Sequence, residues 1–215
     1  TERRLSAVTP AGRERVLASL PGEFTLQDVS RDGRILLERV SGSAELRGFA
    51  PGDTAERDLT WLDNSDAADL SADGKTFLFT ESGSGGGASR AVYKRQMDGS
   101  PPVRLGDGTA LALSPDGKWA MCKLNEQLVL LPTGPGETKT FHGDSITSYQ
   151  AAGWFPDSRR IWFNSVEPGH GVRCQAQDIE GGKPVRVLPE GWRGGLVSPD
   201  GRSFAAVSAD GKFAL

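Results

Sequence analysis

The stretch that decides the fold is Leu113-Ser114-Pro115-Asp116-Gly117-Lys118, because close variants of it return along the whole chain. Five copies are present, each marked by an aspartate, and successive aspartates are separated by 41, 43, 41 and 43 residues: Asp32, Asp73, Asp116, Asp157 and Asp200. Self-similarity at a fixed period of about 42 residues is typical of repeat architectures.

Each copy has the residues of a tight β-hairpin turn. Pro115 suits the second position of a type I turn, Asp116 the third, and Gly117 the left-handed position that follows and forms a G1 bulge. The copy that runs from Trp154 to Arg159 has Ser158 in place of the glycine. We therefore expect a distorted turn there, at a cost of about 1 kcal/mol.

Four strand-like runs surround each turn and are named a to d in chain order. In the third repeat they span 109–114, 119–124, 127–133 and 138–141. A four-stranded antiparallel unit that repeats every 40 to 45 residues is typical of a β-propeller blade. A sandwich or a barrel would not require the same turn sequence in every unit. The predicted fold class is therefore all-β, a β-propeller of four-stranded antiparallel blades.

The predicted domain organisation is a single propeller, or a fragment of one, over 1–215. Its blades are expected at 1–22 (partial), 23–63, 64–106, 107–143, 144–190 and 191–215 (partial). The terminal strands either complete one blade between them or border blades outside this chain. The first residues are neither Met-initiated nor a signal peptide, so we expect the chain to begin inside a longer protein.

Composition excludes several classes of partner. The formal net charge is −3 and the pI is near 5.5, so no general attraction to nucleic acid or anionic lipid is expected. No apolar stretch is long enough for a membrane span. Cys122 and Cys174 are either buried free thiols or a pair across a blade seam, and no Cys/His cluster predicts a metal site. No cofactor is expected.

Catalytic motifs are incomplete throughout the chain. Gly74-Lys75-Thr76 ends like a nucleotide-binding loop but lacks the preceding glycine, and Ser145 lies in a segment that lacks the closing glycine of a nucleophile elbow. The sequence therefore predicts a protein that is not an enzyme.

The Ser-Pro-Asp-Gly-Lys/Arg hairpin resembles the PD40 group of WD40-like repeats, found in TolB-like propellers and in the propellers of prolyl oligopeptidase relatives. The stretch 50–63, followed by 69–76, also resembles the C-terminal propeller of large bacterial serine/threonine kinases. The resemblance implies an extracytoplasmic location, periplasmic or at the cell surface. It also implies that the d–a and b–c loops share one face, where propellers usually bind their ligands.

We expect the ligand-binding residues on that loop face. Trp192 and Arg193 are of the types that dominate protein interfaces, and they are expected on a d–a loop between glycines. The alternative for Trp192 is a hydrophobic lid over the blade seam. The full predicted set is Trp192, Arg193, His142, Tyr149, His170 and Asp144.

The predicted function is a non-enzymatic binding or scaffold module for a protein or peptide ligand, as the sensor or docking domain of a larger bacterial signalling protein. Two alternatives stay open. One is the substrate-gating propeller of a prolyl-oligopeptidase-like hydrolase whose catalytic domain lies outside this chain. The other is a TolB-like periplasmic partner in an envelope complex.

Overall fold

The chain forms two compact units, residues 1–44 and 45–215, and each is described by itself. The structure, a computed structural model, describes residues 2–9, 11–21, 23–30, 34–40, 44–50, 52–87, 90–141, 143 and 145–214.

The first unit contains two antiparallel hairpins. In the first, β1 (Glu2–Val8) pairs with β2 (Glu14–Pro21), and in the second, β3 (Glu23–Val29) pairs with β4 (Ile35–Val40). The aspartate turn of the first repeat, at 31–33, lies outside the described residues.

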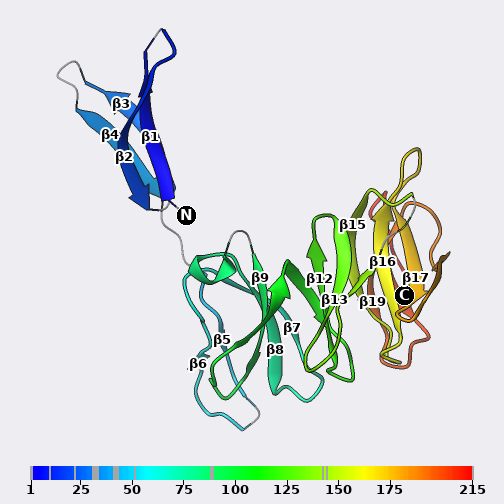
Figure 1. The fold of residues 1–215 in the computed structure, drawn as a ribbon. Helices are drawn as coiled ribbons and strands as arrows, with labels where there is room; N and C mark the ends of the chain where they lie inside the picture. Colours follow the sequence, from blue (N-terminus) through cyan, green and yellow to red (C-terminus); the bar gives the residue numbers. More distant parts are fainter. Residues whose placement is uncertain are drawn as a thin grey trace. The chain divides into compact units, whose positions relative to one another are not determined.

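The second unit is a row of antiparallel sheets in which each strand pairs with the next along the chain (Figure 1). A two-stranded sheet of β5 (Arg47–Gly48) and β6 (Arg57–Asp58) comes first. Three four-stranded sheets follow: β7 (Ser65–Leu70), β8 (Thr76–Glu81), β9 (Ala91–Gln96) and β10 (Val103–Asp107); β11 (Thr109–Leu113), β12 (Trp119–Leu124), β13 (Gln127–Pro132) and β14 (Lys139–Phe141); β15 (Ser148–Trp154), β16 (Arg160–Val166), β17 (Arg173–Asp178) and β18 (Gly181–Arg186). The last sheet has three strands: β19 (Trp192–Val197), β20 (Phe204–Ser208) and β21 (Phe213–Ala214).

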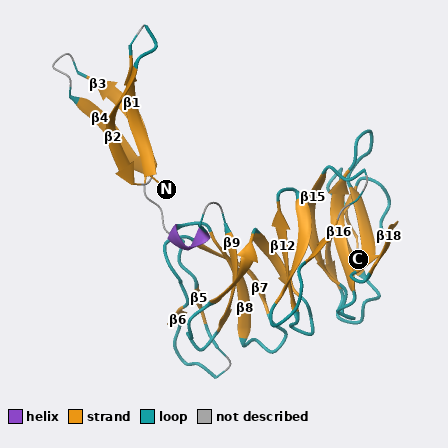
Figure 2. Cartoon of the chain, in the orientation of Figure 1, coloured by secondary structure: helices purple, strands orange, loops and turns teal. Residues whose placement is uncertain are grey.

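These four-stranded sheets confirm the predicted all-β class and the blade architecture. In Figure 2 the described chain consists of strands joined by loops, apart from a short 3₁₀ helix at Ser84–Gly86. Within the described ranges, no helix is long and apolar enough to cross a membrane. The single-domain organisation stays a prediction. So does the four-stranded blade at 23–63, since its strands form two separate sheets, β3 with β4 and β5 with β6.

A hydrogen-bond network explains why the repeat needs its serine and aspartate. The backbone amide of Ser114 donates to Trp119 O (2.8 Å), and the Gly117 amide donates to Ser114 O (2.8 Å) with Gly117 at φ 71°. The Ser114 hydroxyl accepts from the Trp119 amide (2.9 Å) and donates to Asp116 Oδ1 (2.6 Å), which also accepts from the Lys118 amide (3.1 Å). The same bonds close the turns that begin at Ser71 and Ser198.

The copy with Ser158 keeps this closure, so the expected distortion does not occur. Ser158 adopts the left-handed conformation (φ 56°), and its amide donates to Phe155 O (3.2 Å). Phe155 has no hydroxyl to accept a hydrogen bond from the Arg160 amide. Asp157 Oδ1 accepts this bond instead (2.9 Å), in addition to one from the Arg159 amide (3.0 Å). The strain of a non-glycine residue in this region remains.

Apolar side chains from adjacent sheets form the core between blades. Met121 and Leu130 of β12 and β13 belong to one cluster with Tyr149 and Phe163 of the next sheet. Side chains also bond across the seams: Asn164 Oδ1 accepts from the Gly194 amide (2.9 Å), and Asn164 Nδ2 donates to Gly194 O (2.8 Å). The sheets of the second unit are thus joined by packing and by specific hydrogen bonds.

Both cysteines are buried free thiols, as one of the two alternatives predicted. Cys122 packs with Leu78 and Val92 of the preceding sheet, and Cys174 packs with Trp162 and Phe155. They belong to different core clusters and do not form a disulfide.

Candidate functional site

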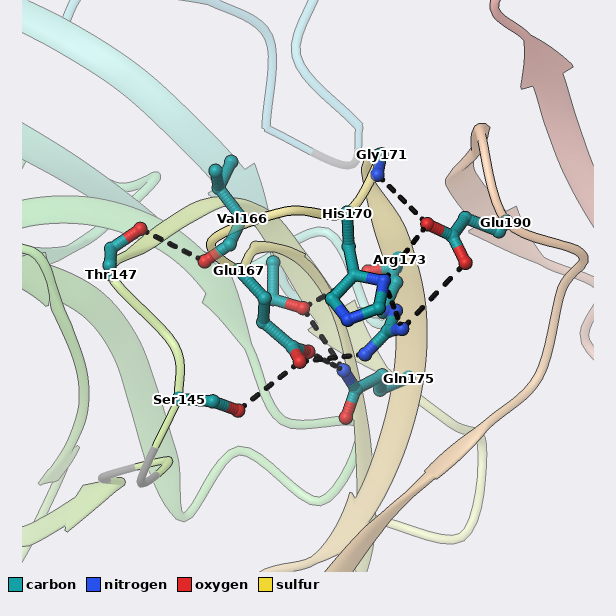
Figure 3. A network of polar contacts seen from close by, with 10 residues as sticks. Ser145, Thr147, Val166, Glu167, His170, Gly171, Arg173, Gln175 and Glu190 are labelled. Atoms are coloured by element: carbon teal, nitrogen blue, oxygen red, sulfur yellow. Dashed lines mark hydrogen bonds and ion pairs between the residues drawn. The ribbon is translucent and has the colours of Figure 1, made fainter.

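A polar network with a buried centre lies beside the loop between β16 and β17, and Figure 3 shows it closely. It consists of five residues, which we call the Glu167 cluster: Glu167, His170, Arg173, Gln175 and Glu190. β16 ends at Val166 and β17 begins at Arg173, so Glu167 and His170 stand on the loop while Arg173 and Gln175 project from the strand.

Glu167 is the centre of the cluster and is only 7% exposed. Its Oε2 accepts from Arg173 Nη1 (2.7 Å) and from the Ser145 hydroxyl (3.2 Å), and its Oε1 accepts from Gln175 Nε2 (2.7 Å). A buried carboxylate is tolerated only when it is paired and hydrogen-bonded in this way. The network therefore holds the loop rigidly against β17.

Arg173 links Glu167 to the histidine. Its Nη2 lies 2.6 Å from His170 Nδ1 and 3.7 Å from Glu190 Oε2. A guanidinium has donors only, so in this contact His170 Nδ1 is the acceptor. Arg173 Nε is buried without an acceptor, so the cluster has one donor more than it satisfies.

Glu190 ties a second loop to the cluster. It precedes β19, and its Oε1 accepts from the Gly171 amide (2.9 Å), while the Gly191 amide donates to Val172 O (2.9 Å). The Gly171 hydrogen bond, followed by the charge of Arg173, lowers the pKa of the Glu190 carboxyl. The loop before β17 and the loop before β19 are therefore held side by side.

A cavity of about 400 Å³ opens beside the cluster. Lys183 and Arg186 of β18 contribute two further cationic side chains to its wall. The polar lining consists of Ser145, Glu167, Arg173, Gln175, Lys183 and Arg186.

Of the predicted site residues that the structure describes, only His170 lies in the cluster. His170 is exposed on the b–c loop, as predicted, and belongs to the cluster. His142 and Asp144 lie outside the described residues. Trp192 and Arg193 are not on a d–a loop: they are the first two residues of β19 and pair with Ser208 and Val207.

The early start of β19 has a physical cause in its glycines. A Cβ atom on Gly194 would lie 2.4 Å from the Phe204 ring and 2.7 Å from Cys174 Sγ, so glycine allows the strand to pack closely here. A register shift between Gly194 and Leu196 lets the strand continue. Trp192 is half-buried and Arg193 is exposed.

The prediction that Tyr149 is a surface residue on a loop is wrong. Tyr149 lies in β15, is 4% exposed, and packs edge-on against Phe163 with ring centroids 5.1 Å apart. Its hydroxyl donates to Phe141 O (3.5 Å). Strand β15 begins at Ser148, and alternation of side chains turns the next residue into the core.

Sequence reasoning missed the roles of Arg173, Gln175, Glu190, Lys183 and Arg186. Arg173 and Gln175 stood in a run assigned only to strand c. The local signal was the presence of opposite charges at the two ends of one short loop, Glu167 and Arg173. Glu190 gave no comparable signal, because it lies on a different loop, the one between β18 and β19, from its partners before β17.

A second buried carboxylate, Glu81, has only an internal role. Its Oε2 accepts from the Ser65 hydroxyl (2.6 Å), and its Oε1 accepts from the amides of Asn64 (3.1 Å) and Gly83 (3.0 Å). These bonds fix the end of β8. Across the part of the chain that the structure describes, no group of three or more His, Cys, Asp or Glu side chains is arranged to hold a metal ion.

Comparisons with known proteins identify the architecture. No protein-family model matches the chain, and no curated protein matches it. A TolB candidate from Agrobacterium tumefaciens is 20% identical over 92% of this chain and 75% of that protein, with a TM-score of 0.62. TolB from Acinetobacter baumannii is 19% identical over 98% of this chain, with a TM-score of 0.57.

The chain spans only 58% of the length of the Acinetobacter protein. The tricorn protease is 13% identical over 99% of this chain but 28% of its own length, with a TM-score of 0.54. At these identities the likeness concerns the fold. The chain therefore has the TolB-like β-propeller fold that its repeat predicts.

Proposed function

We propose that this chain is a non-enzymatic β-propeller module that binds a protein or peptide ligand on the face formed by the loops before β17 and β19. The observation that carries the proposal is the Glu167 cluster, which holds these two irregular loops together on a rigid scaffold. Preorganised loops on rigid strands reduce the entropy that ligand binding costs.

The polar groups of the site are arranged for structure rather than turnover. The Ser145 hydroxyl donates to Glu167, a carboxylate already paired with Arg173. In the described ranges His170 contacts Arg173 and Glu190 rather than a serine or cysteine. A nucleophile needs a base within hydrogen-bond reach. Ser145 has Glu167 within reach, but Arg173 and Gln175 already engage both oxygens of this carboxylate.

The role of the module in a larger protein is a finer proposal. Resemblance to the propellers of bacterial serine/threonine kinases favours a sensor or docking domain, and likeness in fold to the TolB proteins favours a partner in an envelope complex. The tricorn protease likeness supports the second candidate, a propeller that gates access to a hydrolase domain outside this chain.

The test is selection from a random peptide display library on the purified chain. We expect enriched peptides whose affinity falls at least tenfold in the double variant Trp192→Ala/Arg193→Ala. The matched control, Trp61→Ala/Arg47→Ala, removes the same two residue types from β5 and from the segment between β6 and β7. Failure to enrich any peptide, or equal loss in both variants, would overturn the proposal.

The enzymatic alternative needs its own assay. We expect the purified chain to hydrolyse neither peptide nor ester substrates. Turnover that disappears in Ser145→Ala, with unchanged thermal stability, would instead establish an active site here.

A further inference from the structure

The cavity beside the Glu167 cluster has an excess of positive charge. Its lining carries three cations, Arg173, Lys183 and Arg186, and one carboxylate, Glu167. Both carboxylate oxygens are already engaged by Arg173, Gln175 and Ser145. The chain as a whole carries a net charge of −3, so this local excess of cations is not a consequence of composition.

From this charge distribution we propose that the cavity receives a carboxylate side chain, Asp or Glu, from an acidic peptide segment of the bound partner. This inference rests on the proposed binding function and adds the chemical class of the ligand. Lys183 and Arg186 would hold the carboxylate, and the Glu167 cluster would form the rigid wall behind it.

The two β18 cations are available for such a ligand. Both are exposed, and within the described ranges neither forms a salt bridge. The pairing of β18 with β17 explains how both reach one cavity: Ala176 pairs with Val185, but Asp178 pairs with Gly181, so β18 carries extra residues between these pairs. Such an irregularity redirects side chains that would otherwise alternate between faces.

The geometry favours insertion of a side chain over addition of a strand. β18 is an edge strand, and edges of this kind can pair with a peptide backbone. Pro184 lies in its middle and lacks the amide donor that such pairing requires. A partner is therefore recognised here by charge.

The cations that remain for a ligand suit a carboxylate. Glu167 and Glu190 both pair with Arg173, so Lys183 and Arg186 are the cations of the lining that are left to face a ligand. A guanidinium matches a carboxylate through two parallel hydrogen bonds, and an ammonium adds a point charge.

The experiment measures binding of a fluorescent, acetylated and amidated Asp/Glu-rich peptide to the full chain by anisotropy at low salt. The comparison peptides are its Asn/Gln counterpart and a version with phosphoserine in place of the acidic residues. The test variant is Lys183→Gln/Arg186→Gln. The control, Lys75→Gln/Arg202→Gln, removes the same two cation types at exposed aspartate turns.

We expect the acidic peptide to bind the wild-type chain, to lose at least tenfold in affinity for the test variant, and to lose less than twofold for the control. We also expect no binding of the Asn/Gln peptide. Equal losses in both variants would reduce the effect to general electrostatics and overturn the inference. Tighter binding of the phosphoserine peptide would overturn the choice of carboxylate.

The display selection separates this failure from failure of the proposed function. Peptides that are enriched but are neither acidic nor sensitive to Lys183→Gln/Arg186→Gln would leave the binding function standing and overturn the carboxylate site. Absence of any enriched peptide, together with no binding of the acidic probe, would overturn both.

Discussion

The hydroxyl of Ser158 accepts a hydrogen bond of 3.0 Å from the backbone amide of Asp116, so the aspartate turns of two neighbouring blades are joined directly. Ser158 is the one non-glycine residue at its position in the four copies whose turn is described, and it adopts φ 56°. The bond gives the serine a structural role that a glycine lacks. Strain in the Ser158 turn is thus offset by a contact with the Asp116 turn of the preceding blade.

Two substitutions at Ser158 separate strain from the hydrogen bond. Ser158→Ala keeps the left-handed strain and loses the bond, so it should destabilise the chain by about 1 kcal/mol. Ser158→Gly loses the same bond but relieves strain of about 1 kcal/mol, so its net effect should be near zero. Urea denaturation measures both. Equal midpoints for the two variants would show that the left-handed conformation is not strained.

Substitution of Gly117 tests the turn conformation alone. A Cβ atom there would meet nothing within 4 Å, but φ is 71°, so Gly117→Val should cost about 1 to 2 kcal/mol through backbone strain. The control is Gly134→Val, because Gly134 is equally open but is not in the left-handed region. We expect a change within about 0.5 kcal/mol for this control. A control as destabilised as Gly117→Val would contradict the explanation.

The effect of Trp192→Ala on the free energy of unfolding distinguishes a recognition residue from a hydrophobic lid. If the indole is a recognition residue, Trp192→Ala should change the free energy of unfolding by no more than about 0.5 kcal/mol, as surface substitutions do. A hydrophobic lid would lose about 2 kcal/mol or more. Thermal unfolding distinguishes the two, and a loss of the larger size would remove Trp192 from the binding site.

The cysteines should be unreactive in the folded chain. Burial raises the pKa of Cys122 to about 12 and that of Cys174 to about 11, and only the thiolate reacts readily. We expect no reaction with a thiol-specific disulfide reagent at pH 8 in the native state, and reaction of both thiols in urea. Rapid labelling of the native chain would contradict the buried positions.

Because of these two thiols, the free energy of unfolding should fall at high pH. Because their folded-state pKa values are raised, the unfolded chain loses these protons near pH 9 while the folded chain keeps them up to pH 11 to 12. Stability contributed by the neutral thiols is therefore lost as the pH rises through that window. Cys122→Ala/Cys174→Ala should show a flatter dependence of the urea midpoint between pH 9 and 11.

The aspartate turns should weaken in acid. The Ser71 hydroxyl first, and then the Lys75 amide, lowers the pKa of Asp73, and the Ser198 hydroxyl and Arg202 amide act on Asp200 in the same way. Lowered folded-state pKa values contribute stability that is present above the unfolded value, about 3.9, and is lost as the pH falls through the folded one.

The measurement is the urea midpoint between pH 6 and pH 2. The double variant Asp73→Asn/Asp200→Asn should be less stable at pH 6 and should lose less stability on acidification. Glu137→Gln, which changes an exposed carboxylate outside the turns, should leave the acid dependence as in the wild type. An unchanged slope in the double variant would show that the turn carboxylates do not contribute.

The sequence by itself determined the fold, because a propeller blade is built from contacts that are local in the chain. The 42-residue period located the four aspartate turns that the structure describes, and strands such as β8 and β12 begin and end where the alternation of residues predicts. The sequence did not determine how a turn closes. Ser208-Ala209-Asp210-Gly211-Lys212 repeats the pentapeptide that begins at Ser71, yet it closes one residue earlier and joins β20 to β21.

Only the tertiary structure decided the site. The sequence placed His170 on its loop, but Glu190 reaches Arg173 from a different loop, the one before β19, and no local pattern encodes this contact. Tyr149 was expected at the surface, and the position of the neighbouring sheet made it part of the core. Contacts between blades depend on how whole sheets pack against one another, and that packing is a property of the folded chain rather than of any short segment.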